Sequence, residues 1–403
     1  MKIFFSVGEP SGDLHGANLI RELQQQHADW EFVGYGGPRM AAAGCRLHED
    51  LTQLAVMWFL RVLLNLHKFI GLKRRAEQYF SQSRPDAVVL IDYPGFNWHI
   101  ARVARKQGIP VFYYGTPQLW GWASWRVKKL RRDVGHALCK LPFEQAWLRE
   151  RGCNATFVGH PYFDELHTQQ LDQAFIAAQQ NGAEQLVTIL PGSRTQEVKA
   201  NLAQQLQAAK RVAQQAPETR FVIALFKESQ HPMAQRLVDE SGVEATIHVG
   251  RTPELISAAT CCLAVSGSVS LELLHHAKPT AIVYRISRFA FGVQKRFRRV
   301  RYITLVNLLT ADELFPQEVG VYDPADPRDA HVLMPEYLSC TDVAPQLAEH
   351  LLQWLTDPAA RERRIEQLAS LRDLVGQGGA SRTAAEYITH ELSTQGDTAA
   401  AAA

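Results

Sequence analysis

The sequence has few of the features that mark secreted, metal-binding and membrane-spanning proteins. Its 403 residues contain only 6 cysteines and no CxxC pair, which argues against a zinc site or a thioredoxin-like motif. No run of about 18 apolar residues is uninterrupted. The longest, 54–70, is broken by Arg61, Asn65, His67 and Lys68. We therefore expect neither a disulfide framework nor a transmembrane helix.

An excess of charge of one sign is missing as well. The 43 Lys and Arg residues against 41 Asp and Glu residues give a formal net charge of +2, which argues against a dedicated nucleic-acid-binding protein. The hydrophobic share of 46% is ordinary for globular proteins and excludes disordered and fibrous classes. Because Met1 leads directly into an apolar strand and no signal peptide is visible, we expect the reducing cytoplasm.

Short β-branched or aromatic runs alternate with longer amphipathic segments, which is typical of parallel βαβ units covered by helices on both faces. A Gln-rich stretch over 168–185 divides two such series, so we expect an α/β protein of two doubly wound domains facing across a cleft. We place the first domain at 1–170 and the second at 171–375. A C-terminal helix and tail follow at 376–403, with disorder from Thr394 onward. The predicted strands are Ile3–Val7, Phe32–Tyr35, Ala87–Ile91, Val111–Tyr114, His136–Cys139, Thr156–Val158, Leu186–Leu190, Phe221–Leu225, Thr246–Val249, Cys262–Val265 and Thr280–Val283.

A glycine-rich turn, Gly8 to Gly16, joins the first predicted strand to a helix. Such a turn lets backbone amides, here around Ser11 and Gly12, approach a ligand at the positive end of the helix dipole. It is not a GxGxxG match, and no Gly-Lys-Ser or Gly-Lys-Thr follows, which excludes a P-loop. The alternative is an ordinary βα turn with Ser11 or Asp13 as the helix N-cap.

Asp92 follows the apolar run 87–91 and precedes a Pro-Gly turn. This position is the carboxyl end of a buried strand, where doubly wound sheets bind their ligands. A carboxylate there is well placed to take a proton from an attacking hydroxyl. The alternative is an aspartate that caps the helix beginning near Asn97.

Two turns in the second half of the chain repeat this pattern. In the first, an arginine can grip a diphosphate with two parallel hydrogen bonds. In the second, small residues let the backbone approach a ligand, and a glutamate in the first helical turn can accept both hydroxyls of a ribose. Together they favour a nucleotide-diphosphate site over two ordinary βα turns. The candidate residues are Gly192, Ser193, Arg194 and Glu197 in the first turn and Ser268, Ser270 and Glu272 in the second.

Basic and aromatic residues alternate in two segments, 120–132 and 285–301, and the second holds seven Arg or Lys and no acid. Solvated helix faces are the usual explanation. Aromatic residues among the charges instead favour contact with anionic lipid, more than single-stranded nucleic acid. The apolar run 54–70 and the basic residues after it are the predicted membrane interface, with Trp58, Phe59, Leu63, Lys73, Arg74 and Arg75 as its candidate residues.

Taken in order, these segments resemble lipid A disaccharide synthase, a family of inverting glycosyltransferases with two Rossmann-like domains in the GT-B arrangement. The resemblance implies transfer from UDP-2,3-diacylglucosamine to 2,3-diacylglucosamine 1-phosphate, giving a β-1,6-linked disaccharide and UDP. It implies an acceptor-side first domain and a donor-binding second domain. The segments that carry it are 8–13, 34–40, 54–57, 91–97, 120–126, 141–144, 158–161, 190–197, 266–272 and 306–309.

The resemblance assigns roles to individual residues. Asp92 matches the proposed general base, and Arg194 with Glu197 matches the pyrophosphate and nucleotide loop. The turn from Ser268 to Glu272 matches the ribose-contacting turn, and Asn307 matches a polar position near the donor. It implies no metal and no cofactor, since no Asp-x-Asp pair stands where a metal would bridge the diphosphate.

Several positions depart from the family pattern. Gly95 stands where an aspartate is usual, and the missing carboxylate could weaken acceptor binding or the proton path. Pro10 and Gly121 each stand where an alanine is usual. The alternatives are therefore another UDP-sugar transferase or epimerase of this fold, or a catalytically silent lipid-binding relative. We expect a cytoplasmic protein associated peripherally with the inner membrane. The sequence leaves a homodimer open.

Overall fold

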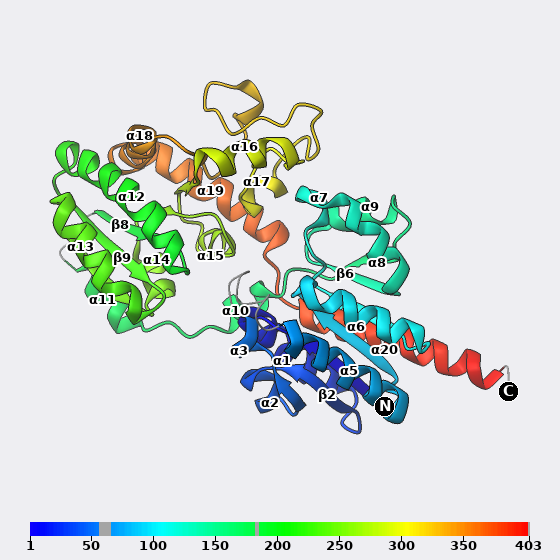
Figure 1. Ribbon diagram of the computed structural model, residues 1–403. Helices are drawn as coiled ribbons and strands as arrows, with labels where there is room; N and C mark the ends of the chain where they lie inside the picture. The colour runs from blue at the N-terminus through cyan, green and yellow to red at the C-terminus, as the bar shows by residue number, and fades with distance from the viewer. Residues whose placement is uncertain (56–65, 182–184, 402–403) are drawn as a thin grey trace. The chain divides into compact units, whose positions relative to one another are not determined.

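The computed structural model describes residues 1–55, 66–181 and 185–401. The chain forms two compact units (Figure 1). Unit 1 comprises Met1–Glu165 together with Gly378–Ala403, and unit 2 comprises Leu166–Gln377. In the described part of the chain, no helix is both long enough and apolar enough to cross a membrane.

Unit 1 is built on a parallel sheet of seven strands in the order β3-β2-β1-β4-β5-β6-β7. Its central strands are buried along their whole length, as expected where helices cover both faces. The strands are β1 (Lys2–Val7), β2 (Glu31–Gly36), β3 (Arg46–Asp50), β4 (Ala87–Ile91), β5 (Val111–Tyr114), β6 (His136–Cys139) and β7 (Ala155–Phe157). The helices are α1 (Pro10–Gln26), α2 (Pro38–Ala42), α3 (Thr52–Ala55), α5 (Leu66–Ser83), α6 (Pro94–Lys106), α7 (Leu119–Trp122), α8 (Val127–Asp133), α9 (Pro142–Arg149), α10 (Tyr162–Thr168, ending in unit 2) and α20 (Ala380–Ala401), with the 3-10 turn η1 (Ser124–Arg126).

Unit 2 is built on a parallel sheet of six strands in the order β10-β9-β8-β11-β12-β13. The strands are β8 (Gln185–Leu190), β9 (Thr219–Leu225), β10 (Ala245–Val249), β11 (Cys261–Ala264), β12 (Thr280–Arg285) and β13 (Glu336–Ser339). The helices are α11 (Gln173–Gln180), α12 (Thr195–Gln215), α13 (His231–Ser241), α14 (Thr252–Ala258), α15 (Val269–His275), α16 (Arg288–Phe297), α17 (Leu305–Leu309), α18 (Ala344–Thr356) and α19 (Pro358–Val375), with the 3-10 turns η2 (Glu228–Gln230) and η3 (Pro327–Asp329). The prediction of two parallel α/β domains is confirmed.

Two strands, β3 and β13, were not predicted from the sequence. Both lie at an edge of their sheet. β3 reads Arg-Leu-His-Glu-Asp and is only partly buried or exposed, while β13 begins with the buried Glu336. An edge strand needs only one paired neighbour, so it lacks the continuous apolar run that marks a central strand.

The C-terminal helix is part of unit 1. α20, red in Figure 1, packs on α1, and its residues Ala384, Ala385, Ile388 and Leu392 are buried in the unit 1 core. The composition predicts disorder from Thr394, whereas the structure continues α20 to Ala401.

Candidate functional site

The strand order of unit 1 reverses between β1 and β4, and this is where open parallel sheets bind ligands. Val7 pairs with Ile91, so the chain leaves both strands at the same level, at Gly8 and Asp92. A β-carbon at Gly8 would lie 2.3 Å from the ring of Tyr93, so only glycine fits there. The structure therefore brings the glycine-rich turn and Asp92 together, as the sequence predicts.

Asp92 has a strained backbone. Asp92 and Tyr93 both have φ of 44°, a left-handed conformation that costs a non-glycine residue roughly 1–3 kcal/mol. The Asp92 carbonyl accepts hydrogen bonds from Tyr113 Oη at 2.6 Å and from Asn97 Nδ2 at 2.9 Å. Asn97 is fully buried and also accepts a hydrogen bond from Ser6 Oγ. The alternative reading, an aspartate that caps α6, is wrong, because the N-cap residue is Tyr93 and has no side-chain capping bond.

The Asp92 carboxylate pairs with Lys140, which follows β6 directly. The distance from Lys140 Nζ to Asp92 Oδ1 is 3.0 Å, and both side chains are largely buried. Burial alone would lower the pKa of Lys140, but Asp92 and Glu144 outweigh it and hold that pKa above its ordinary value. Glu144 also accepts the backbone N–H groups of Lys140 and Leu141. Lys140 is thus a fixed cation against the candidate base, and no motif in the sequence points to it.

Two histidines lie in the electrostatic surroundings of this pair. Burial lowers the pKa of His15 to about 4, although the nearby Asp92 raises it. Burial also lowers the pKa of His160 well below its ordinary value, and the charge of Lys140 adds to this. Both rings are therefore neutral near pH 7. Lys140 is left to balance the charge of Asp92.

The remaining residues of the glycine-rich turn have different roles. Ser11 is exposed in the first turn of α1, and Gly12 is buried, with its missing β-carbon 3.9 Å from Asp92 Oδ2. The alternative, in which Ser11 or Asp13 caps α1, is wrong, since the N-cap residue is Glu9. Asp13 instead accepts the backbone N–H groups of Gly37, Arg39 and Met40 and so caps α2.

In unit 2 the strand order reverses between β8 and β11. Leu190 pairs with Ala264, and the N–H of Val265 donates to the Leu190 carbonyl at 3.0 Å. The two turns singled out in the sequence therefore leave neighbouring strands at the same edge. A β-carbon at Gly192 would lie 2.5 Å from Glu197 Cβ, and the φ of Gly192 is 121°, so the first turn requires glycine.

The Glu197 carboxylate binds the N-terminus of its own helix, α12. It accepts the N–H groups of Ser193 and Arg194 at 3.1 and 3.2 Å, and its other oxygen binds Arg194 Nη1 at 3.0 Å. These two amides are therefore occupied in the structure. The Arg194 side chain is 77% exposed, so its guanidinium keeps donors that face solvent.

The second turn of unit 2 is partly exposed. Ser268 is exposed, whereas Ser270 is buried and donates to the Gly267 carbonyl at 2.9 Å, and Glu272 is buried in α15. Asn307 on α17 is fully buried, and its amide donates to the Met334 carbonyl and to Glu336. Both amide hydrogens are thus used within the protein.

The predicted membrane-interface residues are only partly described. Trp58, Phe59 and Leu63 lie outside the described residues. On α5, Lys73 pairs with Glu77 at 3.6 Å and Arg75 with Glu49 at 2.9 Å. Arg74 is exposed.

Two parallel α/β units, each with candidate turns at its strand-order reversal, are the architecture of the GT-B fold. A glycosyltransferase of calicheamicin, CalG4, matches with a TM-score of 0.57 and 15% identity, covering 98% of each chain. UDP-GlcNAc 2-epimerase from Neisseria meningitidis matches with a TM-score of 0.61 and 14% identity, covering 97% of this chain and 100% of that chain. These likenesses establish the fold.

The family follows from sequence comparison. The profile of the lipid-A-disaccharide synthetase family, LpxB, matches residues 3–334. Lipid-A-disaccharide synthases of Trichlorobacter lovleyi and Geobacter sulfurreducens are 33% and 30% identical, over 96% and 98% of this chain and the same shares of their own. The chain belongs to the lipid-A-disaccharide synthase family and is a glycosyltransferase.

Proposed function

We propose that this glycosyltransferase moves a diacylated glucosamine from UDP to the 6-hydroxyl of diacylglucosamine 1-phosphate, with Asp92 as the general base. The observation that carries the assignment of Asp92 is its fixed position. A strained, doubly hydrogen-bonded backbone and a 3.0 Å pair with Lys140 hold the carboxylate at the ligand-binding edge of the sheet.

In this reaction Asp92 removes the proton of the acceptor 6-hydroxyl as its oxygen attacks the anomeric carbon of the donor. The bond between that carbon and the diphosphate oxygen breaks, and its electron pair leaves with UDP. Attack opposite the leaving group inverts the anomeric centre. Lys140 keeps the carboxylate in one orientation, which is the condition for efficient proton transfer.

On the donor side, the exposed guanidinium of Arg194 is proposed to grip the diphosphate, where negative charge grows as the bond breaks. Glu197 is proposed to act indirectly, since its carboxylate fixes Arg194 and the turn from Gly192. Ser268, at the start of α15, is exposed and can meet the nucleotide. Glu272 and Ser270 are proposed to shape that turn.

Because the proposed substrates are acylated and reside in a membrane, the enzyme is proposed to act at an anionic membrane surface on the cytoplasmic side. In unit 1 the exposed Arg74 and the exposed side chains of Trp122 and Trp125 support this proposal. Arg126 lies over the Trp122 ring at 5.3 Å, which keeps cation and aromatic side by side at the surface.

The test is Asp92→Asn, with the carboxylate replaced by an amide of the same shape. We expect kcat to fall by about 10²–10⁴-fold, because the amide cannot take the proton. UDP affinity should stay close to wild type, because the base acts on the acceptor. Purified protein is assayed with both acylated substrates in detergent, and the product is identified by mass spectrometry. A variant that retains more than about a tenth of wild-type kcat contradicts the assignment, and epimerisation of the donor without disaccharide formation contradicts the reaction.

A further inference from the structure

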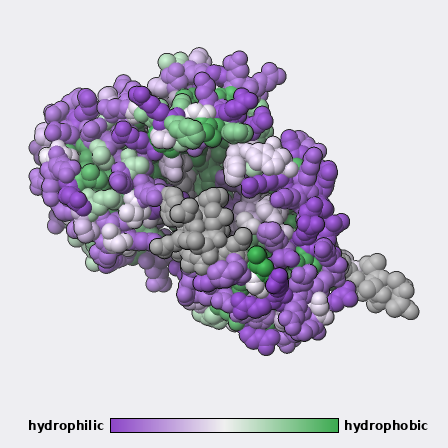
Figure 2. Space-filling view, viewed as in Figure 1, coloured by the Kyte–Doolittle hydropathy of each residue, from purple (hydrophilic) through white to green (hydrophobic). Residues whose placement is uncertain are grey.

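The helix α16 in unit 2 presents an apolar stripe to solvent. No residue of α16 is buried. Phe289, Val293 and Phe297 are 82%, 43% and 52% exposed. Their four-residue spacing places them on one face of the helix, and apolar surface is visible in the region of α16 in Figure 2.

Exposed cations accompany this stripe: Arg296 lies beside it, and Arg288 and Lys295 lie on the other side of the helix. Arg288, Lys295 and Arg296 on the helix are exposed, as are Arg285 and Arg299 beside it. Among the described residues, none of these five makes an ion pair within 4.0 Å with an acidic group. No acidic residue occurs between positions 285 and 301.

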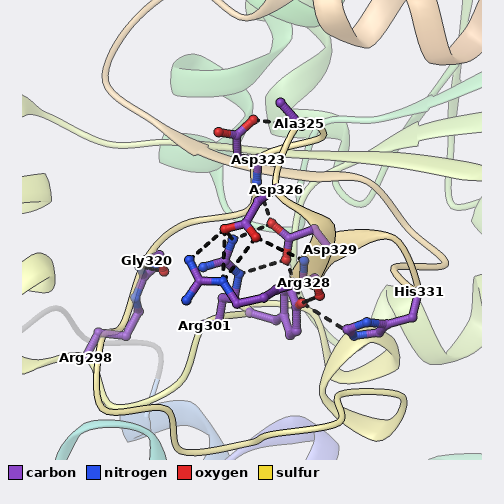
Figure 3. A network of polar contacts seen from close by, with 10 residues as sticks. Arg298, Arg301, Gly320, Asp323, Ala325, Asp326, Arg328, Asp329 and His331 are labelled. Atoms are coloured by element: carbon purple, nitrogen blue, oxygen red, sulfur yellow. Dashed lines mark hydrogen bonds and ion pairs between the residues drawn. The ribbon is translucent and has the colours of Figure 1, made fainter.

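Arg298 and Arg301, in the same segment, have a different role (Figure 3). Arg301 is buried and binds Asp326 at 2.8 Å and Asp329 at 2.7 Å, and Arg298 donates to the Gly320 carbonyl at 2.6 Å. These two arginines attach the chain after α16 to the loop 320–329. The basic segment thus divides into a part that anchors the chain and an exposed part whose cations form no ion pair within 4.0 Å in the described chain.

We propose that the exposed face of α16 docks on an anionic phospholipid surface, with Phe289, Val293 and Phe297 entering the headgroup boundary. An apolar stripe on one face and Lys and Arg on the rest of the helix is the pattern of helices that lie in a membrane interface. The positive charges fit phosphate headgroups, whose attraction falls off within a Debye length. This surface lies in the unit that carries the donor turns and is distinct from α5. The proposal deepens the proposed function, because acylated substrates reside in such a surface.

The experiment is co-sedimentation of the full chain with phosphatidylcholine vesicles, with and without phosphatidylglycerol. One variant combines Phe289→Ser, Val293→Ser and Phe297→Ser, and a second combines Arg288→Gln, Lys295→Gln and Arg296→Gln. The apolar control combines Phe226→Ser and Leu374→Ser, which are 62% and 77% exposed outside α16. The charge control combines Arg211→Gln, Arg236→Gln and Arg363→Gln, exposed positions that change the net charge equally.

We expect the wild-type chain and both controls to sediment with anionic vesicles at physiological salt. Both α16 variants should lose most of this binding, with unchanged melting temperatures because the altered side chains are exposed. Wild-type binding by the apolar α16 variant would overturn the proposal. A wild-type dimer that the α16 variants dissociate, with vesicle binding unchanged, would also overturn it and assign the face to a second copy.

Activity in detergent separates this proposal from the proposed function. The α16 variants should transfer the sugar to detergent-dispersed acceptor at the wild-type rate. A wild-type chain that binds vesicles but forms no disaccharide in detergent would contradict the function alone. Normal activity without vesicle binding by the wild-type chain would contradict the docking surface alone.

Discussion

At the scale of single residues, Asp92 carries two costs that an ordinary surface carboxylate avoids. Its left-handed backbone is unfavourable, and its charge is partly buried against Lys140. Tyr113 and Asn97 hold the backbone in place. Strain that the surrounding structure maintains at a ligand-binding edge is typical of a functional residue.

Lys140→Met tests whether this cation orients the base. Removing the ammonium should lower kcat by about 10²-fold, the usual cost of displacing a reacting group by about 1 Å. UDP affinity should not change, because Lys140 acts on the base and the base acts on the acceptor. Kinetics and calorimetric UDP titration measure the two effects, with the exposed Lys128→Met as the control. A kcat within twofold of wild type would show that Asp92 needs no such partner.

His15 gives a pH dependence of stability. Its folded pKa of about 4 lies below the ordinary histidine value of 6.5, so the unfolded chain binds the proton first as the pH falls. The neutral His15 ring contributes to the free energy of unfolding above pH 6.5, and this contribution is lost as the pH falls toward 4. Between pH 7 and pH 5 this amounts to about 2 kcal/mol.

Urea unfolding at pH 7 and pH 5 measures this effect. The His15→Gln variant should lose less stability between the two pH values than the wild-type chain. The control His390→Gln removes an exposed histidine from α20 and should keep the wild-type dependence. Equal pH dependence in wild type and His15→Gln would mean that the buried ring contributes nothing to it.

At the scale of helices and strands, two carboxylates in the glycine turns make backbone contacts that the sequence pattern did not predict. Asp13 caps α2, which lies after the next strand, rather than its own helix. Glu197 caps α12 and fixes Arg194. In both turns the pattern of glycine and acid correctly predicts a strand-to-helix connection. It cannot tell which backbone amides the acid will reach, because that depends on the neighbouring element.

Lys140 shows the same limitation at a strand end. It stands in the printed sequence as one lysine between a predicted strand and a Leu-Pro-Phe-Glu segment. Its partner Asp92 is 48 residues away and follows β4, which is not adjacent to β6, since β5 lies between them. A pair formed across an intervening strand leaves no spacing signal in the sequence.

At the scale of the whole molecule, the chain returns to its first unit after completing the second. Ile388 on α20 is fully buried in the unit 1 core, which also contains Ala17 and Leu19 of α1. Unit 1 therefore needs the last part of the chain for its stability. Truncation analysis based on sequence position alone would treat this helix as a tail.

Ile388→Ala should destabilise unit 1 by about 3 kcal/mol through a cavity. Tryptophan fluorescence reports mainly on this unit, because of the 8 tryptophans only Trp354 belongs to unit 2. The urea midpoint by fluorescence should fall for Ile388→Ala. The matched control Leu351→Ala, buried in unit 2, should leave that midpoint nearly unchanged. Equal shifts for both variants would show that the two units unfold as one.

The sequence by itself determined the two series of βα units, the family and the turns that carry the candidate residues. Apolar runs and glycine turns are local, and their physical causes act within a few residues. The tertiary structure decided which carboxylate is held by which cation, which acids cap which helices, and where the last helix packs. It also decided which of the basic and aromatic residues at 285–301 face solvent, because helical register and distant counter-charges such as Asp329 select among them. These features depend on contacts between residues far apart in the chain, and such contacts exist only once the fold has formed.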